Sequence, residues 1–253
     1  MIPFLKKEIM EHIRSGRLLL LGILFAMFGV MNPAIAKLTP WLLELFADTL
    51  EGSGMVITEV TVTALDSWMQ FYKNLPMALI AFVLLEGSVF TKEYQSGTLV
   101  LSLTKGLERY KIVVPKFAVL AALWSMGYWL CFGITYGYNA YFWDNSIAQH
   151  LLFSVVCWWM FGLWVVGLIT LLSVAFLSSG AVLLGTGGIV AASYLLSLVP
   201  KLSKYLPTLL TDGTSLIYGM AETEKYIPAL WIVGVLTIVG FALSILLFNR
   251  KQL

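Results

Sequence analysis

The polar residues that could carry a function gather in one short stretch of an otherwise apolar chain. Residues 86–116 contain several charges and a glycine turn, set between two long apolar runs. Glycine permits a tight turn, and the side chains after it form a small apolar surface, called the docking knob below. A loop in water has no use for such an apolar surface unless another protein packs on it. We therefore expect this stretch to dock a partner protein. The residues expected to take part are Glu93, Gly97, Thr98, Leu99, Leu101 and Arg109.

Patterns typical of enzymes and metal sites do not occur in the sequence. There is no GxxxxGK[ST] phosphate-binding loop and no HExxH motif. His12 and His150 are the only histidines, and we expect them on opposite faces of a membrane, which argues against a histidine metal site. No basic stripe points to nucleic acid. We therefore expect no catalytic residue, no metal and no cofactor bound by this chain.

The composition indicates that most of the 253 residues lie in lipid. Hydrophobic residues make up 59% of the chain and charged residues only 12%, whereas soluble domains carry about 25% charge. Six apolar runs are long enough to cross a bilayer as helices. We predict an all-α membrane protein, one domain over residues 1–253, whose spans are 18–36, 75–90, 112–138, 151–176, 181–199 and 229–248.

The distribution of lysine and arginine predicts the orientation. Most of the 16 fall in segments that share one side with the N-terminus, so the positive-inside rule places both termini in the cytosol of a cell-membrane protein. Residues 1–17 are basic and amphipathic, which predicts an interfacial helix. Residues 91–110 are then a cytosolic coupling loop with a short helix. Residues 37–74 and 200–228 are extracellular; the second should form short helices, and alternation over residues 55–63 of the first suits a strand.

Few polar residues lie inside the predicted spans. Buried ionisable groups in a membrane often mark an ion or substrate path. Glu86 is the one acidic candidate, although it could simply pair with Lys92 or Lys116. Tyr136 and Asn139 are further candidates for a translocation path.

The docking stretch resembles the first cytosolic loop of the ABC-2 type permeases, the membrane subunits of ATP-binding-cassette exporters. The matching residues are Glu93, Gly97-Thr98-Leu99, Leu101-Ser102-Leu103, Arg109 and Lys116. Many members have a proline where this chain has Thr104 to Glu108, and Gly106 can break the helix there instead. The six-span plan is also similar to that family, so the resemblance covers nearly the whole chain.

The resemblance implies an exporter subunit that works with two kinds of partner. One is a separate ATPase subunit that uses ATP and Mg²⁺. The other is a second permease chain, identical or different, paired through the first, second and fifth spans. Small residues that permit close packing there are Gly22, Ala26, Gly29, Gly180, Gly185 and Gly188. The aromatic content favours an amphipathic cargo such as a peptide, lipid or drug. An ion-coupled secondary carrier and a non-transporting membrane sensor or scaffold are the alternatives.

Overall fold

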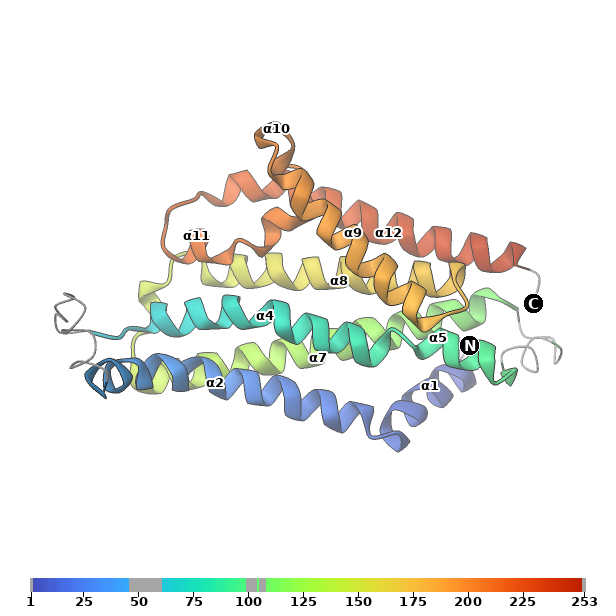
Figure 1. Ribbon diagram of the computed structural model, residues 1–253, viewed down its shortest axis with the longest axis horizontal. Helices are drawn as coiled ribbons and strands as arrows, with labels where there is room; N and C mark the ends of the chain where they lie inside the picture. Colours follow the sequence, from blue (N-terminus) through green and yellow to red (C-terminus); the bar gives the residue numbers. More distant parts are fainter. Residues whose placement is uncertain (1, 46–60, 99–103, 105–107, 252–253) are drawn as a thin grey trace.

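The computed structural model describes residues 2–45, 61–98, 104 and 108–251, and these residues form an all-helical bundle (Figure 1). No β-strand occurs among them, so the predicted fold class is confirmed. The helices are α1 (Ile2–Arg14), α2 (Arg17–Leu45), α4 (Ala64–Glu86), α5 (Val89–Gln95), α7 (Tyr110–Phe142), α8 (Leu151–Ala175), α9 (Ser179–Ser197), α10 (Pro200–Ser203), α11 (Gly213–Ile217) and α12 (Ile227–Arg250). Short 3-10 helices are η1 (Asn145–Ile147), η2 (Pro207–Thr211) and η3 (Thr223–Tyr226).

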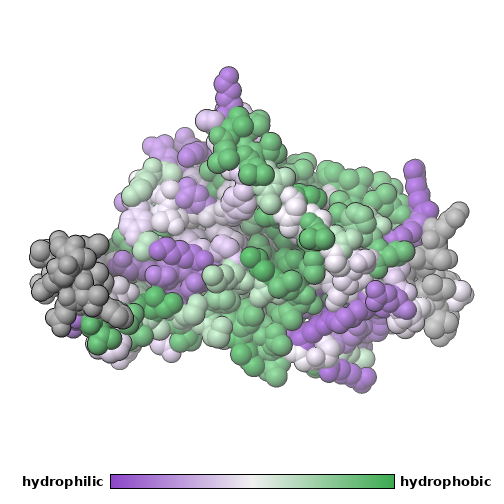
Figure 2. Space-filling view, in the orientation of Figure 1, coloured by the Kyte–Doolittle hydropathy of each residue, from purple (hydrophilic) through white to green (hydrophobic). Residues whose placement is uncertain are grey.

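Six helical segments are long and apolar enough to cross a membrane, as the sequence predicts. They are Arg17–Leu42, Ala64–Gln95, Tyr110–Phe142, Leu151–Ala175, Ser179–Ser197 and Thr223–Arg250. Figure 2 shows apolar residues over the middle of the visible face and hydrophilic residues mainly toward its two ends. Side chains on α9 and α12, such as Leu184 and Trp231, are largely exposed, which suits helices that face lipid.

Two predicted boundaries differ from the structure. Helix α2 continues to residue 45, and α4 begins at residue 64, so most of the described residues of the predicted segment 37–74 are helical. The early start of α4 has a local cause. Thr63 and Asp66 form a capping box, in which the Asp66 carboxylate accepts a hydrogen bond from the Thr63 backbone N–H at 2.8 Å. Residues 55–60 of the predicted strand lie outside the described residues, and residues 61–63 have no regular structure.

A polar chain of hydrogen bonds holds α2 against α4 and α7. Pro33 has no N–H, so the Gly29 carbonyl lacks its usual donor within α2. The Thr135 hydroxyl of α7 donates to that carbonyl at 3.0 Å. Asn32 donates to Thr135 at 3.0 Å and accepts from Asn74 of α4 at 2.8 Å. Neighbouring helices thus satisfy the backbone group that the proline leaves open, as a membrane interior requires.

The bundle has two distinct ends. We call the end that carries α1, α5 and the last turn of α12 the terminal end, because the first and last helices meet there on the right of Figure 1. The end that carries η1 and α11 is the far end. The two ends hold different polar groups: ion pairs around Lys116 at the terminal end, and Asp144 with its Ser146 partner at the far end.

Candidate functional site

Helix α1 turns its polar side chains toward the bundle. Glu8 and His12 are 1% and 3% exposed, whereas Ile13 is 55% exposed. They lie four residues apart, so they share one face of the helix. Ile9 and Ile13 of the apolar face therefore point outward, as expected for a helix that lies at a membrane surface, whereas Leu5 packs against the core. Glu8 and His12 meet the other helices.

A buried network of ion pairs joins α1, α5 and α7. The Lys116 ammonium of α7 lies 2.9 Å from a Glu8 oxygen and 3.1 Å from a Glu93 oxygen. Lys7 of α1 also pairs with Glu93. Lys116, Glu8 and Glu93 are 1%, 1% and 6% exposed. An unpaired charge so deeply buried is strongly unfavourable, so each member depends on its partners.

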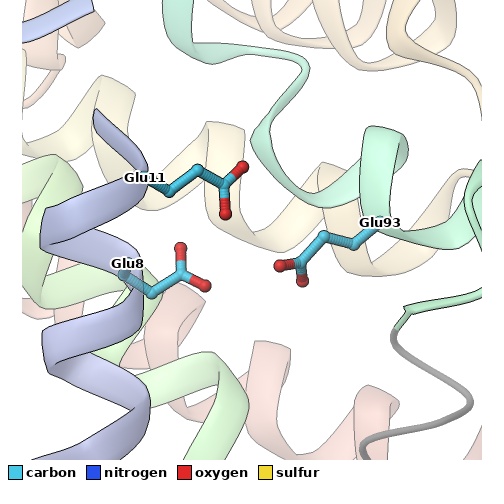
Figure 3. A group of neighbouring side chains, drawn as sticks. All are labelled: Glu8, Glu11 and Glu93. Atoms are coloured by element: carbon cyan, nitrogen blue, oxygen red, sulfur yellow. The ribbon is translucent and has the colours of Figure 1, made fainter. Parts of the chain in front are cut away.

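Three carboxylates meet in this network. Figure 3 shows Glu8 and Glu11 of α1 turned toward Glu93 of α5, and one oxygen of each lies within 4.8 Å of the others. Such a set could hold a hard cation such as Mg²⁺ or Ca²⁺. The ammonium groups of Lys7 and Lys116 already occupy this position and neutralise most of its charge. The arrangement is therefore an ion-pair network, and the structure gives no reason to assign a metal.

A second buried pair links α1 to the end of α4. His12 Nε2 lies 3.0 Å from a Glu86 oxygen, and Nδ1 lies 2.9 Å from the Glu8 carbonyl oxygen. Each ring nitrogen thus faces an oxygen atom, an arrangement that favours the protonated imidazolium, which donates from both nitrogens. Burial disfavours that charge, but the hydrogen bonds to Glu86 and Glu8 outweigh burial and raise the pKa of His12. Arg17 lies 3.9 Å from the same Glu86 oxygen.

Glu86 thus finds partners that differ from those predicted. Glu86 pairs with His12 and Arg17 instead of Lys92 or Lys116. Lys116 is buried within α7 and is not a loop cation. The other oxygen of Glu86 is buried with no hydrogen-bond partner among the described residues.

Arg109 holds helix ends together. Its guanidinium donates to the Phe248 carbonyl at 2.7 Å and also to the Lys251 carbonyl, near the C-terminus of α12. Lys251 in turn donates to the Val174 carbonyl at 2.5 Å, in the last turn of α8. Helix C-termini leave carbonyls without intrahelical partners, and these cations satisfy them. The start of α7 is thereby fixed to the ends of α12 and α8.

The glycine turn has the conformation that makes glycine necessary. Gly97 has φ of +68°, a region that side chains other than Asn, Asp and Gly rarely adopt. The hydroxyls of Ser96 and Thr98 lie 2.9 Å apart across it. The apolar residues Leu99 and Leu101 of the predicted docking knob lie outside the described residues.

The three candidates for a translocation path do not lie together. Glu86 is at the terminal end, beside α1. Asn139 is on α7 toward the far end, about 35 Å from Lys116 at 1.5 Å per residue. It is fully buried, and neither side-chain polar atom has a hydrogen-bond partner among the described residues. Tyr136 lines a cavity at the far end and is half-exposed.

Sequence reasoning missed several members of the site. Lys7 and Glu8 fall in the predicted interfacial helix without a role of their own, and His12 is considered only as a metal ligand. The i, i+4 spacing of Glu8 and His12 on a helix with an opposite apolar face is a signal that could have indicated them. A lysine at position 116, inside an apolar run, is a second such signal.

Comparison with known proteins supports the membrane assignment. The chain is 26% identical over 216 residues to the Uncharacterized transmembrane protein YxlG of Bacillus subtilis (strain 168), which covers 82% of this chain and 80% of that protein. No family model and no solved structure matches the chain. The six apolar helices and this relative together identify a multi-pass membrane protein.

Proposed function

We propose that this chain is the permease subunit of an ATP-binding-cassette exporter, in which α5 and the turn after it receive movement from a separate ATPase. The observation that carries the proposal is the buried network that fixes Glu93 of α5 to α1 and α7. A docking loop can move spans only if it is rigidly attached to them. The resemblance of residues 93–116 to the first cytosolic loop of ABC-2 permeases points to the same segment.

The attachment defines which helices would move together. Helix α5 follows α4 after only Gly87 and Ser88, and Tyr110 begins α7 on the other side of the loop. Lys116 and Glu93 then join α5 to α7, and Lys7 joins α5 to α1. A push on the turn at Gly97 would therefore act on α1, α4 and α7 as one unit.

The burial of Glu93 assigns it a positioning role. A carboxylate that is 6% exposed and paired with two lysines has little surface for a cation of the ATPase. Exposed residues of the same segment, Lys92, Gln95 and Ser96, are better placed to touch a partner. Glu93 would hold α5 in position while its neighbours make the contact.

The remaining parts of the proposal concern orientation and assembly. The terminal end would face the cytosol, where ATP and Mg²⁺ act in the partner ATPase. A second permease chain, identical or different, would complete the path for an amphipathic peptide, lipid or drug. Of the small residues expected at its seam, Gly22 and Gly188 face open space, whereas Gly29 packs against Ile134 and Gly185 lies near Leu172 within this chain.

The test compares variants in the assembled transporter. Gly97→Val should reduce export and its coupling to ATP hydrolysis, because a β-branched residue is strained at a φ of +68°. Gly97→Asn is the matched control, since Asn tolerates that conformation. Glu93→Gln should also uncouple export by loosening α5. Export and ATP hydrolysis are measured in vesicles that contain this chain and a candidate cassette ATPase partner. Normal coupling in both Gly97→Val and Glu93→Gln would refute the proposal.

A proton-coupled carrier is the second candidate, and one observation favours it. Glu86 is a fully buried carboxylate in a candidate span, paired with a histidine, and its other oxygen has no hydrogen-bond partner in the described part of the chain. Such pairs can exchange protons in transporters. In vesicles without any ATPase, a proton gradient should then drive transport that Glu86→Gln abolishes. Transport that requires ATP and ignores the gradient would reject this candidate.

A further inference from the structure

The far end of the bundle contains a cavity of about 520 Å³ between α7, η1 and the first turn of α8. Its wall includes three aromatic side chains, Phe132, Tyr136 and Trp143. Asp144 and Asn145 line it on the η1 side, and Leu151 lines it from α8. The volume falls in the range of small-molecule sites, roughly 300–1,000 Å³. The residues of the lining determine which class of ligand the cavity would bind.

The aromatic wall is held in place by the surrounding helices. The Phe132 ring stacks on Trp68 of α4 at 5.5 Å between centroids, and the Tyr136 ring lies 5.8 Å from Phe132. Asn145 accepts a hydrogen bond from the Trp68 indole N–H at 3.0 Å and donates to the Tyr136 carbonyl at 3.2 Å. These contacts tie η1 to α4 and α7, so the lining is preorganised without any ligand.

Asp144 gives the cavity a negative charge. Its carboxylate accepts from the Ser146 hydroxyl at 2.6 Å and from the Ser146 backbone N–H at 2.9 Å. The Ser146 hydroxyl and backbone bonds lower the pKa of Asp144, so it is ionised at neutral pH. No lysine or arginine lies among the described residues of the lining. The aromatic faces add the negative side of their quadrupoles.

From these features we propose that the cavity binds an organic cation with an apolar substituent, such as a quaternary ammonium group on an aryl or alkyl chain. The cation lies against the rings of Tyr136 and Trp143 within reach of the Asp144 field, and the apolar part contacts Phe132 and Leu151. An anion is repelled by Asp144, and a neutral molecule gains nothing from it. The site belongs to this chain alone, so it does not depend on the transport proposal.

The experiment is a direct binding measurement on the purified chain. Benzyltrimethylammonium is titrated in a calorimeter against the protein in an uncharged maltoside detergent. Its neutral carbon isostere, neopentylbenzene, has the same shape without the charge. We expect the cation to bind at least about tenfold more tightly than the isostere, because ring and carboxylate act only on the charge. Equal affinity, or no binding of the cation, would overturn the proposal.

Variants locate the site. Asp144→Asn removes the charge at an exposed position and should weaken cation binding about tenfold, with little effect on folding. Tyr136→Leu should weaken it to a similar extent, whereas Tyr136→Phe, which keeps the ring, should not. Glu222→Gln removes an exposed carboxylate outside the lining and is the control. If Asp144→Asn binds the cation as tightly as Glu222→Gln does, the proposal is wrong.

A competitor identifies the source of the natural cation. Dodecylphosphocholine carries the same quaternary ammonium group on a lipid-like headgroup. Displacement of benzyltrimethylammonium by it, lost in Asp144→Asn, supports the site and assigns a lipid headgroup. Tight cation binding without this displacement supports the site and assigns a free cation.

Discussion

Replacement of Lys116 by methionine should destabilise the protein far more than the loss of an ordinary lysine. Methionine fills a similar volume but removes the fully buried one of the two ammonium groups that pair with both Glu8 and Glu93. Lys116 is 1% exposed, so water cannot take its place without opening the network. The two carboxylates then face each other in a region of low dielectric, with only the half-exposed Lys7 to balance them.

The size of the stability loss in Lys116→Met follows from the distances between the paired charges. At 2.9 Å and an effective dielectric constant of 20, one ion pair is worth about 6 kcal/mol before desolvation is counted. Burying the two ions offsets part of this, and loss of one partner from a buried pair costs about 3–5 kcal/mol. For a chain of this size that corresponds to a fall in Tm of about 6–20 °C. The substitution Glu8→Gln in the Lys116→Met background should recover part of the loss, because it removes one of the unbalanced anions.

Thermal unfolding in detergent can be followed with a thiol-reactive fluorescent dye. Cys131 and Cys157 are both buried free thiols, so they react only when the bundle opens. Lys111→Met is the matched control on the same helix. Lys111 also pairs with a glutamate at 3.0 Å, but that Glu108 partner is 57% exposed. Exposed pairs contribute little, so we expect no measurable change in Tm.

Comparing the Tm of Lys116→Met with that of Lys111→Met tests whether the buried network stabilises the bundle. If Lys116→Met unfolds at the temperature of Lys111→Met, the buried network does not hold α1 and α5 to the bundle. A loss in Lys116→Met that Glu8→Gln deepens would also contradict the charge argument, because it would trace the loss to packing.

Three further predictions use the same unfolding assay. Thr135→Val should lower Tm by a few degrees because it leaves the Gly29 carbonyl unpaired. Pro33→Ala in the same chain should restore Tm by supplying a backbone donor for that carbonyl. If Tm does not recover, Thr135 does not replace the donor that Pro33 lacks. His12 has a raised pKa, so its stabilising contribution is complete below about pH 6.5 and is lost as pH rises through the raised value. The Tm of the wild type should therefore fall between about pH 6 and 9 more steeply than the Tm of His12→Gln. Parallel curves of Tm against pH would contradict this prediction. Gly162→Ala should be strongly destabilising because its Cβ would lie 2.1 Å from a buried tryptophan ring, whereas alanine at a glycine that faces open space should be tolerated.

The spans were predictable because lipid imposes length and apolarity on any helix that crosses it. The start of α4 was not predictable in this way, because the first turns of this helix are amphipathic. Trp68, Phe71 and Tyr72 are buried there among polar neighbours, so a search for a continuous apolar run begins too late. The Thr63–Asp66 capping box marks the true start and is visible in the sequence.

The candidate site was predictable only in part, and the reason is sequence separation. Glu86 and Glu93 stand out because carboxylates are rare in this chain. Their partners on α1 cannot be read from the sequence, because Lys7 and Glu93 are 86 positions apart and His12 and Glu86 are 74 positions apart, so only the fold joins them. No local pattern says which of the 16 lysines and arginines will meet a given carboxylate. Burial favours an anchoring role for Glu93, whose partners are Lys7 and Lys116.

Charges at the terminal end therefore divide into two groups with different physical properties. Buried charges such as Glu93 and Lys116 act in a low dielectric, are weakly screened by salt, and fix the relative positions of the helices. Exposed charges such as Lys92 and Glu108 act through water, are screened by salt, and are available to a partner protein. Affinity for a partner should then depend on ionic strength through the exposed group. Transmission of the partner's movement should depend on the buried group and be almost insensitive to salt. In the proposed transporter, this division would allow binding of the ATPase and transmission of its movement to be controlled separately.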